Sequence, residues 1–175
     1  YYFLGHSMGS FLLRQYLSTS DEMREDGSRV TYSEGLAGAV VMGTGWQPEA
    51  VLSFGRGMCK FLSLFGGWHK KSRLIDSLSF GPYFKRIPEP RTANDWLSVN
   101  EENVDNYRAD PWCGFTFTLN GYYNLFTAIK FAQNKMLMRD INSKMPILFI
   151  AGAEDPVGAY GEGVRKAFVA YEENT

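Results

Sequence analysis

The chain has 175 residues, enough for one domain with a substantial core, and 45% of them are hydrophobic. Its 18 Lys and Arg residues nearly balance 19 Asp and Glu residues, so the formal net charge of −1 excludes the basic excess typical of nucleic-acid-binding proteins. No apolar run approaches the length of a membrane span, and two cysteines are too few for a disulfide framework. We therefore expect Cys59 and Cys113 to be reduced, buried thiols.

The N-terminal part predicts a strand, a helix and a second strand. Residues 1–4 are an apolar run that predicts a short buried strand, and residues 10–17 have the spacing of a helix with one apolar face. The polar, turn-rich segment 18–35 indicates a surface connection. Small apolar residues bounded by glycine at 36–45 are typical of a strand buried on both faces of a parallel sheet.

A long helical segment follows the second strand. Helical spacing over 48–65, 69–80, 92–108 and 118–141 predicts four helices, which glycine and proline residues separate. No convincing alternation of apolar and polar residues occurs in this part, so we expect no strand in it.

The C-terminal part returns to strand and helix. Residues 147–155 predict a buried strand that ends at two acids, and residues 161–173 predict a helix. The alternation predicts an α/β fold with a parallel sheet, whose core comprises 1–46 and 143–175 and whose helical cap comprises 47–142. Because three strands are too few for a complete domain of this type and no initiator Met is present, we expect the chain to be part of a longer protein.

One serine lies between two glycines where the first strand meets the first helix. Gly5-His6-Ser7-Met8-Gly9 matches G-x-S-x-G, a pattern that is weak alone but specific between a strand and a helix. A tight turn there strains the serine backbone and lifts its hydroxyl above the sheet edge, while the glycines leave room. The Met8 N–H then points to where an oxyanion would form. We predict Ser7 as a nucleophile; the alternative is a serine that only caps the helix.

The carboxylate partner of such a serine is expected after a later strand, since the chain order in this architecture is Ser, acid, His. Asp155 follows the strand and a small turn, and Pro156 helps to fix its loop. A carboxylate there would orient an imidazole and stabilise the imidazolium. Glu154 is the competing acid, and the alternative for Asp155 is an ordinary turn-forming aspartate before proline.

Neither histidine occupies the position expected for the base. His6 adjoins the serine, but neighbouring side chains at such a turn point apart, so we expect His6 to make a structural hydrogen bond. His69 would reverse the expected chain order, and we expect it to be solvated or lightly packed. We therefore expect the base beyond residue 175 and a second oxyanion donor before residue 1.

Three stretches together resemble α/β-hydrolases of the monoacylglycerol lipase and lysophospholipase-like group. The first resembles the nucleophile turn of that group, the second its cap motif and the third its acid-bearing strand. They are GHSMGS at 5–10, WLSVNEENVDNYRADPWCGF at 96–115 and MPILFIAGAEDPVG at 145–158. The second is the most discriminating, because it separates this group from α/β-hydrolases at large. The resemblance covers most of the chain.

The resemblance implies a serine hydrolase that cleaves carboxylic esters of single acyl chains beneath a cap. It implies Ser7 as nucleophile, Met8 as oxyanion donor through its N–H, and Asp155 as triad acid, with Gly5, His6 and Gly9 shaping the turn. No metal or cofactor is expected. The expected partner is a small acyl ester, without nucleic acid or stable membrane insertion but with transient lipid contact through the cap, and the expected location is cytoplasmic.

Some alternatives stay open. Apolar cap residues can shelter an acyl chain or only pack the cap's own core; they are Phe54, Met58, Phe61, Leu62, Phe65 and Trp68. The same scaffold supports an aminopeptidase or another amide hydrolase, in which Glu101 and Glu102 would bind a free amino terminus. The missing base leaves a catalytically inert fragment or non-catalytic homologue as a third reading. Asp110 and Pro111 are expected to form a turn.

Overall fold

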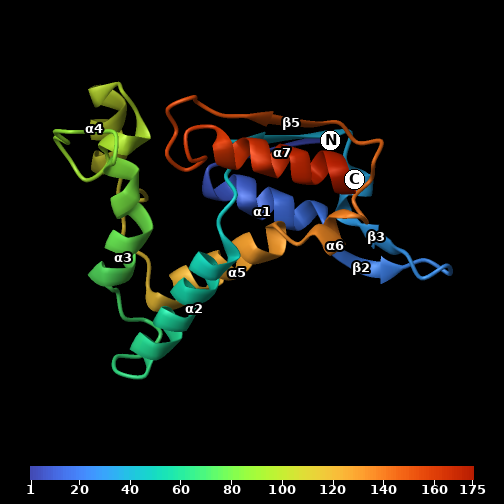
Figure 1. The fold of residues 1–175 in the computed structure, drawn as a ribbon, viewed down its shortest axis with the longest axis horizontal. Helices are drawn as coiled ribbons and strands as arrows, with labels where there is room; N and C mark the ends of the chain where they lie inside the picture. Colours follow the sequence, from blue (N-terminus) through green and yellow to red (C-terminus); the bar gives the residue numbers. More distant parts are fainter. The chain divides into compact units, whose positions relative to one another are not determined.

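The computed structural model describes residues 1–175 and contains five strands and seven α-helices (Figure 1). The strands are β1 (Tyr2–His6), β2 (Ser20–Met23), β3 (Arg29–Thr31), β4 (Gly38–Met42) and β5 (Ile147–Ile150). The helices are α1 (Met8–Leu17), α2 (Glu49–Ser63), α3 (Arg73–Phe80), α4 (Glu101–Ala109), α5 (Leu119–Ala132), α6 (Lys135–Met138) and α7 (Glu162–Asn174). None of these helices combines the length and apolar character needed to cross a bilayer.

The chain divides into two compact units. The first comprises Tyr1–Leu52 and Phe126–Thr175 and contains every strand, and the second comprises Ser53–Leu125. The boundaries between the units fall inside α2 and α5. The sequence instead predicted the boundaries at the two ends of the helical segment 47–142. Helix α6 belongs with the sheet because its Met138 packs in the core of the first unit.

Strands β1, β4 and β5 form a parallel sheet with β4 in the middle, which confirms the predicted α/β class. In its register, His6 of β1 pairs with Met42 of β4, and Met42 pairs with Ile150 of β5. Because all three strands run in the same direction, the segments that follow them leave the sheet at one edge (Figure 1). This edge, formed by the carboxyl ends of the strands, is where Ser7 and Asp155 are expected to lie.

Helices α1 and α7 pack on the same face of this sheet. Buried side chains from both helices and from β4 form its core, among them Leu13, Leu17, Ala39, Val41, Ala170 and Tyr171. On the opposite face, Leu4, Val40 and Leu148 lie side by side, and Leu4 and Leu148 are 64% and 56% exposed. The predictions of a buried strand at 1–4 and of a second strand buried on both faces are therefore wrong, because both packed helices lie on one side.

The polar segment 18–35 contains an antiparallel hairpin, β2–β3, that the sequence did not predict. Its turn has recognisable chemistry: the Asp26 carboxylate accepts the Ser28 N–H at 2.9 Å, and Gly27 has a φ of 82°. The two strands are short and show no alternation of apolar and polar residues, so the period of two that marks a strand is missing.

The second unit is helical, apart from a single bridge between Lys71 and Thr118. The Tyr122 hydroxyl of α5 donates to the Asp76 carboxylate of α3 at 2.5 Å and ties these helices together. The helix predicted over 92–108 is confined to α4 and a short 3-10 turn, because Asn100 caps α4 by accepting the Glu102 N–H at 2.9 Å. The helix predicted over 118–141 breaks into α5 and α6.

The structure agrees in most respects with the predictions for the two cysteines and for Asp110 and Pro111. Both cysteines are free thiols; Cys59 is buried, as predicted, whereas Cys113 is only half-buried. Burial raises the pKa of the Cys59 thiol. Asp110 forms the predicted turn, in which its carboxylate accepts the Trp112 N–H at 2.8 Å.

Candidate active site

Ser7 joins β1 to α1 in a backbone conformation that side chains rarely adopt. Its φ of 51° and ψ of −120° lie in a region that favours glycine, at a cost of about 1–3 kcal/mol. Its side chain makes no capping hydrogen bond to α1, so the reading of Ser7 as a simple helix cap gains no support. Ser7 as a whole is half-buried, and its hydroxyl is therefore left for another partner.

Hydrogen bonds hold the backbone of this turn in place. The Ser7 N–H donates to the Met42 carbonyl of β4 at 2.9 Å, and the Ser10 N–H and hydroxyl donate to the Ser7 carbonyl at 2.9 and 2.6 Å. As the first residue of α1, Met8 has an N–H without an intrahelical acceptor, at the positive end of the helix dipole. The turn thus presents a hydroxyl next to an amide that could stabilise an oxyanion.

The two glycines of the turn have different steric roles. A Cβ added to Gly5 would collide with the Gly9 carbonyl and lie 2.8 Å from the Leu13 Cβ, so α1 can follow β1 this closely only if residue 5 is glycine. A Cβ added to Gly9 would meet nothing within 4 Å. The expectation that both glycines leave room for the turn therefore holds for Gly5 and is wrong for Gly9.

Asp155 lies in the loop that follows β5. Its Oδ1 accepts the Val157 N–H at 2.9 Å, and its carbonyl accepts the Tyr160 N–H at 3.0 Å. Ala159 and Tyr160 have φ values of 49° and 57°, so the loop curls back tightly on itself. Asp155 is half-buried, whereas the competing Glu154 is exposed.

The segments that leave β1, β4 and β5 converge around Gly43. The Gly43 N–H donates to the Ile150 carbonyl at 2.9 Å and continues the sheet beyond β4. The position that a Cβ on Gly43 would occupy is 3.4 Å from Asp155 Oδ2 and 3.5 Å from His6 Nε2. The structure thus brings Asp155 to the edge that also bears Ser7. The His6 imidazole makes no hydrogen bond, so the structural hydrogen bond predicted for it is wrong.

The sequence matches the family Hydrolase_4, described as serine aminopeptidase, S33, over residues 1–172. The chain belongs to this family of α/β-hydrolases. This assignment rests on nearly the whole chain, both the strands that bear Ser7 and Asp155 and the helices between them. A search of the curated proteins gave no match.

Two solved structures resemble the hydrolase chain closely. A highly thermostable carboxyl esterase from Bacillus coagulans, solved in complex with glycerol, is 27% identical with a TM-score of 0.83, and the match covers 99% of this chain and 53% of the esterase. A lipase in its open form is 19% identical with a TM-score of 0.78, over 98% of this chain and 52% of the lipase, and supports the fold alone. The chain spans about half the length of these structures.

A buried arginine next to the candidate site was not predicted from the sequence. Arg14 of α1 is fully buried and forms no ion pair. Its guanidinium donates to Thr44 Oγ1 at 3.2 Å, to the Gly45 carbonyl at 2.8 Å and to the Ala132 carbonyl at 3.3 Å. The available signal was one cation within the apolar pattern of residues 10–17, which periodicity alone assigns to solvent.

Aromatic rings replace a counter-ion around this guanidinium. The ring centroids of Phe11, Trp46 and Tyr171 lie 5.5–5.7 Å from it. Burial lowers the pKa of Arg14, and the neighbouring Tyr171 partly opposes that change. Burial also raises the pKa of Tyr171. Cation–π contact therefore helps to keep a buried charge that no carboxylate neutralises.

Arg14 supports the loop that bears Asp155 indirectly. The segment after β4 that it holds lies directly against the segment after β5: a Cβ on Gly45 would collide with the Val157 carbonyl, and one on Gly158 would lie 2.9 Å from the Thr44 carbonyl. The Val157 amide in turn holds the Asp155 carboxylate. A continuous set of contacts thus runs from the helix that follows Ser7 to the predicted acid.

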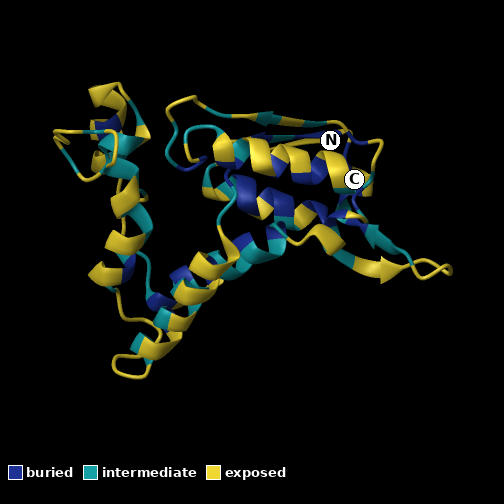
Figure 2. Ribbon diagram, viewed as in Figure 1, coloured by how far each residue is buried: buried dark blue, intermediate teal, exposed yellow.

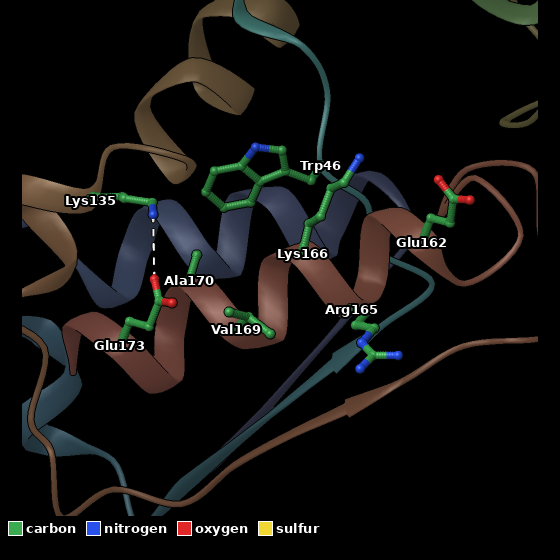
Figure 3. A pocket seen from close by; sticks show the side chains of 8 residues that line it. All are labelled: Trp46, Lys135, Glu162, Arg165, Lys166, Val169, Ala170 and Glu173. Carbon is green, nitrogen blue, oxygen red and sulfur yellow. Dashed lines mark ion pairs between the residues drawn. The ribbon is translucent and has the colours of Figure 1, made fainter.

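The remaining candidates lie outside this site. His69 is exposed, as expected, and belongs to the second unit. A surface cavity of about 470 Å³ lies along α7, with Trp46 and Lys135 facing it (Figure 3). Lys135 and Glu173 form an ion pair there at 3.5 Å. Neither Ser7 nor Asp155 lines this cavity, so it is separate from the candidate site.

Proposed function

We propose that the protein containing this chain cleaves carboxylic esters of single-acyl-chain lipids, of the monoacylglycerol or lysophospholipid type, through an acyl-enzyme on Ser7. The observation that carries the proposal is the glycine-like backbone of Ser7, whose uncapped hydroxyl lies at the sheet edge that also bears Asp155. Strained residues of this kind cluster at active sites. The carboxyl esterase at 27% identity supports ester chemistry, and the stretch 96–115 supports the single-acyl-chain class.

In the proposed reaction, Ser7 Oγ attacks the ester carbonyl while its proton passes to a histidine. The Met8 N–H and a second donor stabilise the negative oxygen of the tetrahedral intermediate. The imidazolium then gives its proton to the leaving alcohol, and water attacks the acyl-enzyme with the imidazole as base. These steps require no metal or cofactor.

Asp155 suits the role of the acid that orients this histidine. Its Oδ1 is held by the Val157 N–H, and Oδ2 accepts no hydrogen bond within the chain, which leaves it for an imidazole N–H. We propose that the histidine comes from outside residues 1–175. His6 lies against Gly43, His69 belongs to the other unit, and the matched esterase is about twice as long as this chain.

The helical segment 47–142 is proposed to act as a cap. A cap excludes water from an acyl-enzyme and surrounds the acyl chain with apolar side chains. Met58 and Leu62 of α2 are half-buried and are candidates for that contact. Phe54, Phe61 and Phe65 are exposed, so the alternative in which they pack only the cap's own core is wrong for these three.

Labelling by a fluorophosphonate probe tests the nucleophile in the protein that contains this chain. Ser7→Ala is expected to abolish labelling and to reduce turnover of a nitrophenyl acyl ester by more than about a thousandfold, because the covalent step disappears. Ser28→Ala is a matched control, since it removes a hydroxyl from the exposed β2–β3 turn. Undiminished labelling or turnover in Ser7→Ala would refute the assignment, and an unlabelled wild-type protein would support the non-catalytic reading.

An aminopeptidase is the second candidate, and the family description is the observation that favours it. In this version, Glu101 and Glu102 at the start of α4 would bind the free amino terminus of a peptide; both side chains are exposed. Turnover of aminoacyl amides and of acyl esters should be compared in the wild-type protein and in Glu101→Gln with Glu102→Gln. Amide turnover that exceeds ester turnover and falls in this variant would favour the aminopeptidase.

A further inference from the structure

Arg14 of α1 binds two segments that lie far from it in the sequence. Much of α1 is buried (Figure 2), and Arg14 is fully buried in the first unit. Its Nη1 donates to Thr44 Oγ1 and to the Gly45 carbonyl, which follow β4, and its Nη2 donates to the Ala132 carbonyl at the end of α5. One side chain thus fixes the segment after β4 against both the helix that follows Ser7 and the end of α5.

Close backbone contacts join the segment after β4 to the loop after β5. A Cβ added to Gly45 would lie 2.4 Å from the Val157 carbonyl oxygen. A Cβ added to Gly163 would lie 3.0 Å from the Trp46 nitrogen, and the Gly163 N–H donates to the Gly158 carbonyl at 2.8 Å. Because packing this close leaves neither segment free to shift alone, a change in the position of the first moves the second.

Val157 connects these contacts to the Asp155 carboxylate. Its carbonyl faces Gly45, and its N–H donates to Asp155 Oδ1 at 2.9 Å. Val157 is itself buried, so it follows a displacement of its surroundings. A misplacement of about 1 Å in a reacting group lowers a rate by about a hundredfold, even when its origin lies far from the chemistry. The contacts from Arg14 therefore reach the carboxylate that would orient the triad histidine.

Stability alone does not account for an arginine at this position. No carboxylate pairs with the guanidinium, and Arg14 Nε is buried without a hydrogen bond. A buried, unpaired charge costs free energy, and an apolar side chain of similar size would fill much of the same space without that cost. Residues that break a local rule in this way are expected where function requires them. The fork of the guanidinium supplies such a reason, because it binds Gly45 and Ala132 at once.

We propose that Arg14 is a positioning residue for the reaction on Ser7: through the segments after β4 and β5, it places the Asp155 carboxylate where the triad histidine meets it. The proposal rests on the proposed function, because it needs a triad in which Asp155 is the acid. Since Arg14 is fully buried, it touches no substrate. Without Arg14, the carboxylate would orient the histidine less well and would stabilise the imidazolium less. Turnover would then fall while substrate binding stays, and the histidine would lose its proton at a lower pH.

Steady-state turnover of a nitrophenyl acyl ester by the protein that contains this chain tests the proposal. Arg14→Met should lower kcat about a hundredfold, leave KM within about twofold, and shift the acidic limb of the pH profile of kcat/KM to lower pH. Arg14→Lys should regain at most about tenfold, because one ammonium cannot hold both carbonyls. Arg139→Met is the matched control: it removes an exposed arginine of the same unit and should leave kcat, KM and the pH profile unchanged.

Two further variants separate a positioning role from a structural one. Thr44→Val removes one acceptor of Arg14 and keeps the shape of the side chain, so it should lower kcat by about three- to tenfold and shift the pH profile in the same direction, even if Arg14→Met does not fold. In the Asp155→Asn protein, adding Arg14→Met should slow fluorophosphonate labelling by no more than about twofold, because the effects of two residues that act through one group do not add.

The outcomes distinguish the positioning role from the function on which it rests. Arg14→Met with the wild-type kcat and pH profile would overturn the proposal. So would an equal loss in the proteins with Asp155 and with Asn at that position, because Arg14 would then act on the fold or on Ser7 alone. Turnover that persists in Ser7→Ala is a different outcome, since it refutes the proposed function itself and the positioning role with it.

Discussion

The backbone of Ser7 is strained, and hydrogen bonds with neighbouring residues hold it in this conformation. Its positive φ costs about 1–3 kcal/mol, and the structure offsets that cost through hydrogen bonds to Met42 and Ser10. A glycine at position 7 would adopt the same conformation without strain. The residue that best suits the fold at this position therefore differs from the one that suits nucleophilic chemistry.

This difference predicts the relative stability of two variants. Ser7→Gly should have a free energy of unfolding about 1 kcal/mol higher than Ser7→Ala, because glycine relieves the strain while alanine keeps it, and the extra freedom of glycine in the unfolded chain offsets only part of the gain. Urea denaturation measures both values. If Ser7→Ala is as stable as Ser7→Gly, the turn is not strained.

Single residues also show why part of the site could be predicted from sequence. G-x-S-x-G between a strand and a helix predicted the strained turn at Ser7, because the pattern and its flanks together specify one kind of turn. Arg14 could not be identified, because its role depends on Thr44, Gly45 and the rings of Trp46 and Tyr171, which come from segments that are distant in the sequence. A local sequence pattern predicts local backbone geometry, whereas the environment of a buried charge such as Arg14 depends on which distant residues the fold places around it.

At the scale of elements, one buried tyrosine joins two helices of the second unit. Tyr122 of α5 is nearly fully buried and donates to Asp76 of α3. Burial, and to a smaller extent this hydrogen bond, raise the pKa of Tyr122 above its ordinary value. A raised pKa in the folded state means that the stabilisation is complete below the unfolded pKa of about 10 and is lost as the pH rises above it.

Tyr122→Phe should therefore weaken the alkaline loss of stability. We expect the variant to be about 1–3 kcal/mol less stable at neutral pH, because Asp76 loses a donor, and to show a shallower fall in stability above about pH 10. Urea denaturation at a series of pH values measures both effects. Tyr2→Phe is the control, since it removes an exposed hydroxyl. An unchanged alkaline slope in Tyr122→Phe would contradict the role assigned to this tyrosine.

Helices and strands could be predicted where the apolar residues follow a single pattern, either helical spacing or a continuous run. The apolar run at 36–45 gave β4 and its parallel pairing, and helical spacing gave α2 and α7 within a few residues. The hairpin at 18–35 was missed because its strands are short and polar throughout. Periodicity also could not show which face of β4 a helix covers, because that depends on where α1 and α7 pack.

At the scale of the whole molecule, the face of the sheet opposite α1 and α7 is an exposed apolar surface of the first unit. Leu4, Leu148 and Ile150 are among its exposed side chains, and β1 and β5 are both edge strands. Contiguous apolar surface of this kind marks a contact site or an aggregation liability.

The chain of 175 residues is therefore expected to self-associate and to bind the dye ANS. Leu4→Lys with Leu148→Lys places two charges in one register row and should lower both ANS fluorescence and the oligomeric fraction, as measured by analytical ultracentrifugation. Val99→Lys, at a fully exposed position of the second unit, is the control. A monomeric wild-type chain that does not bind ANS would contradict the expectation.

The order of the strands in the sheet has a consequence for biosynthesis. β4 pairs with β1 soon after both are made, but its other neighbour, β5, arrives only after the long segment from Gly43 to Pro146. Closing so long a loop is entropically costly, and parallel pairing across it is slow. A nascent chain on the ribosome therefore carries a central strand that stays unpaired along one side until β5 leaves the exit tunnel. Since Asp155 follows β5 directly, β5 joins β4 and Asp155 reaches the sheet in the same late step.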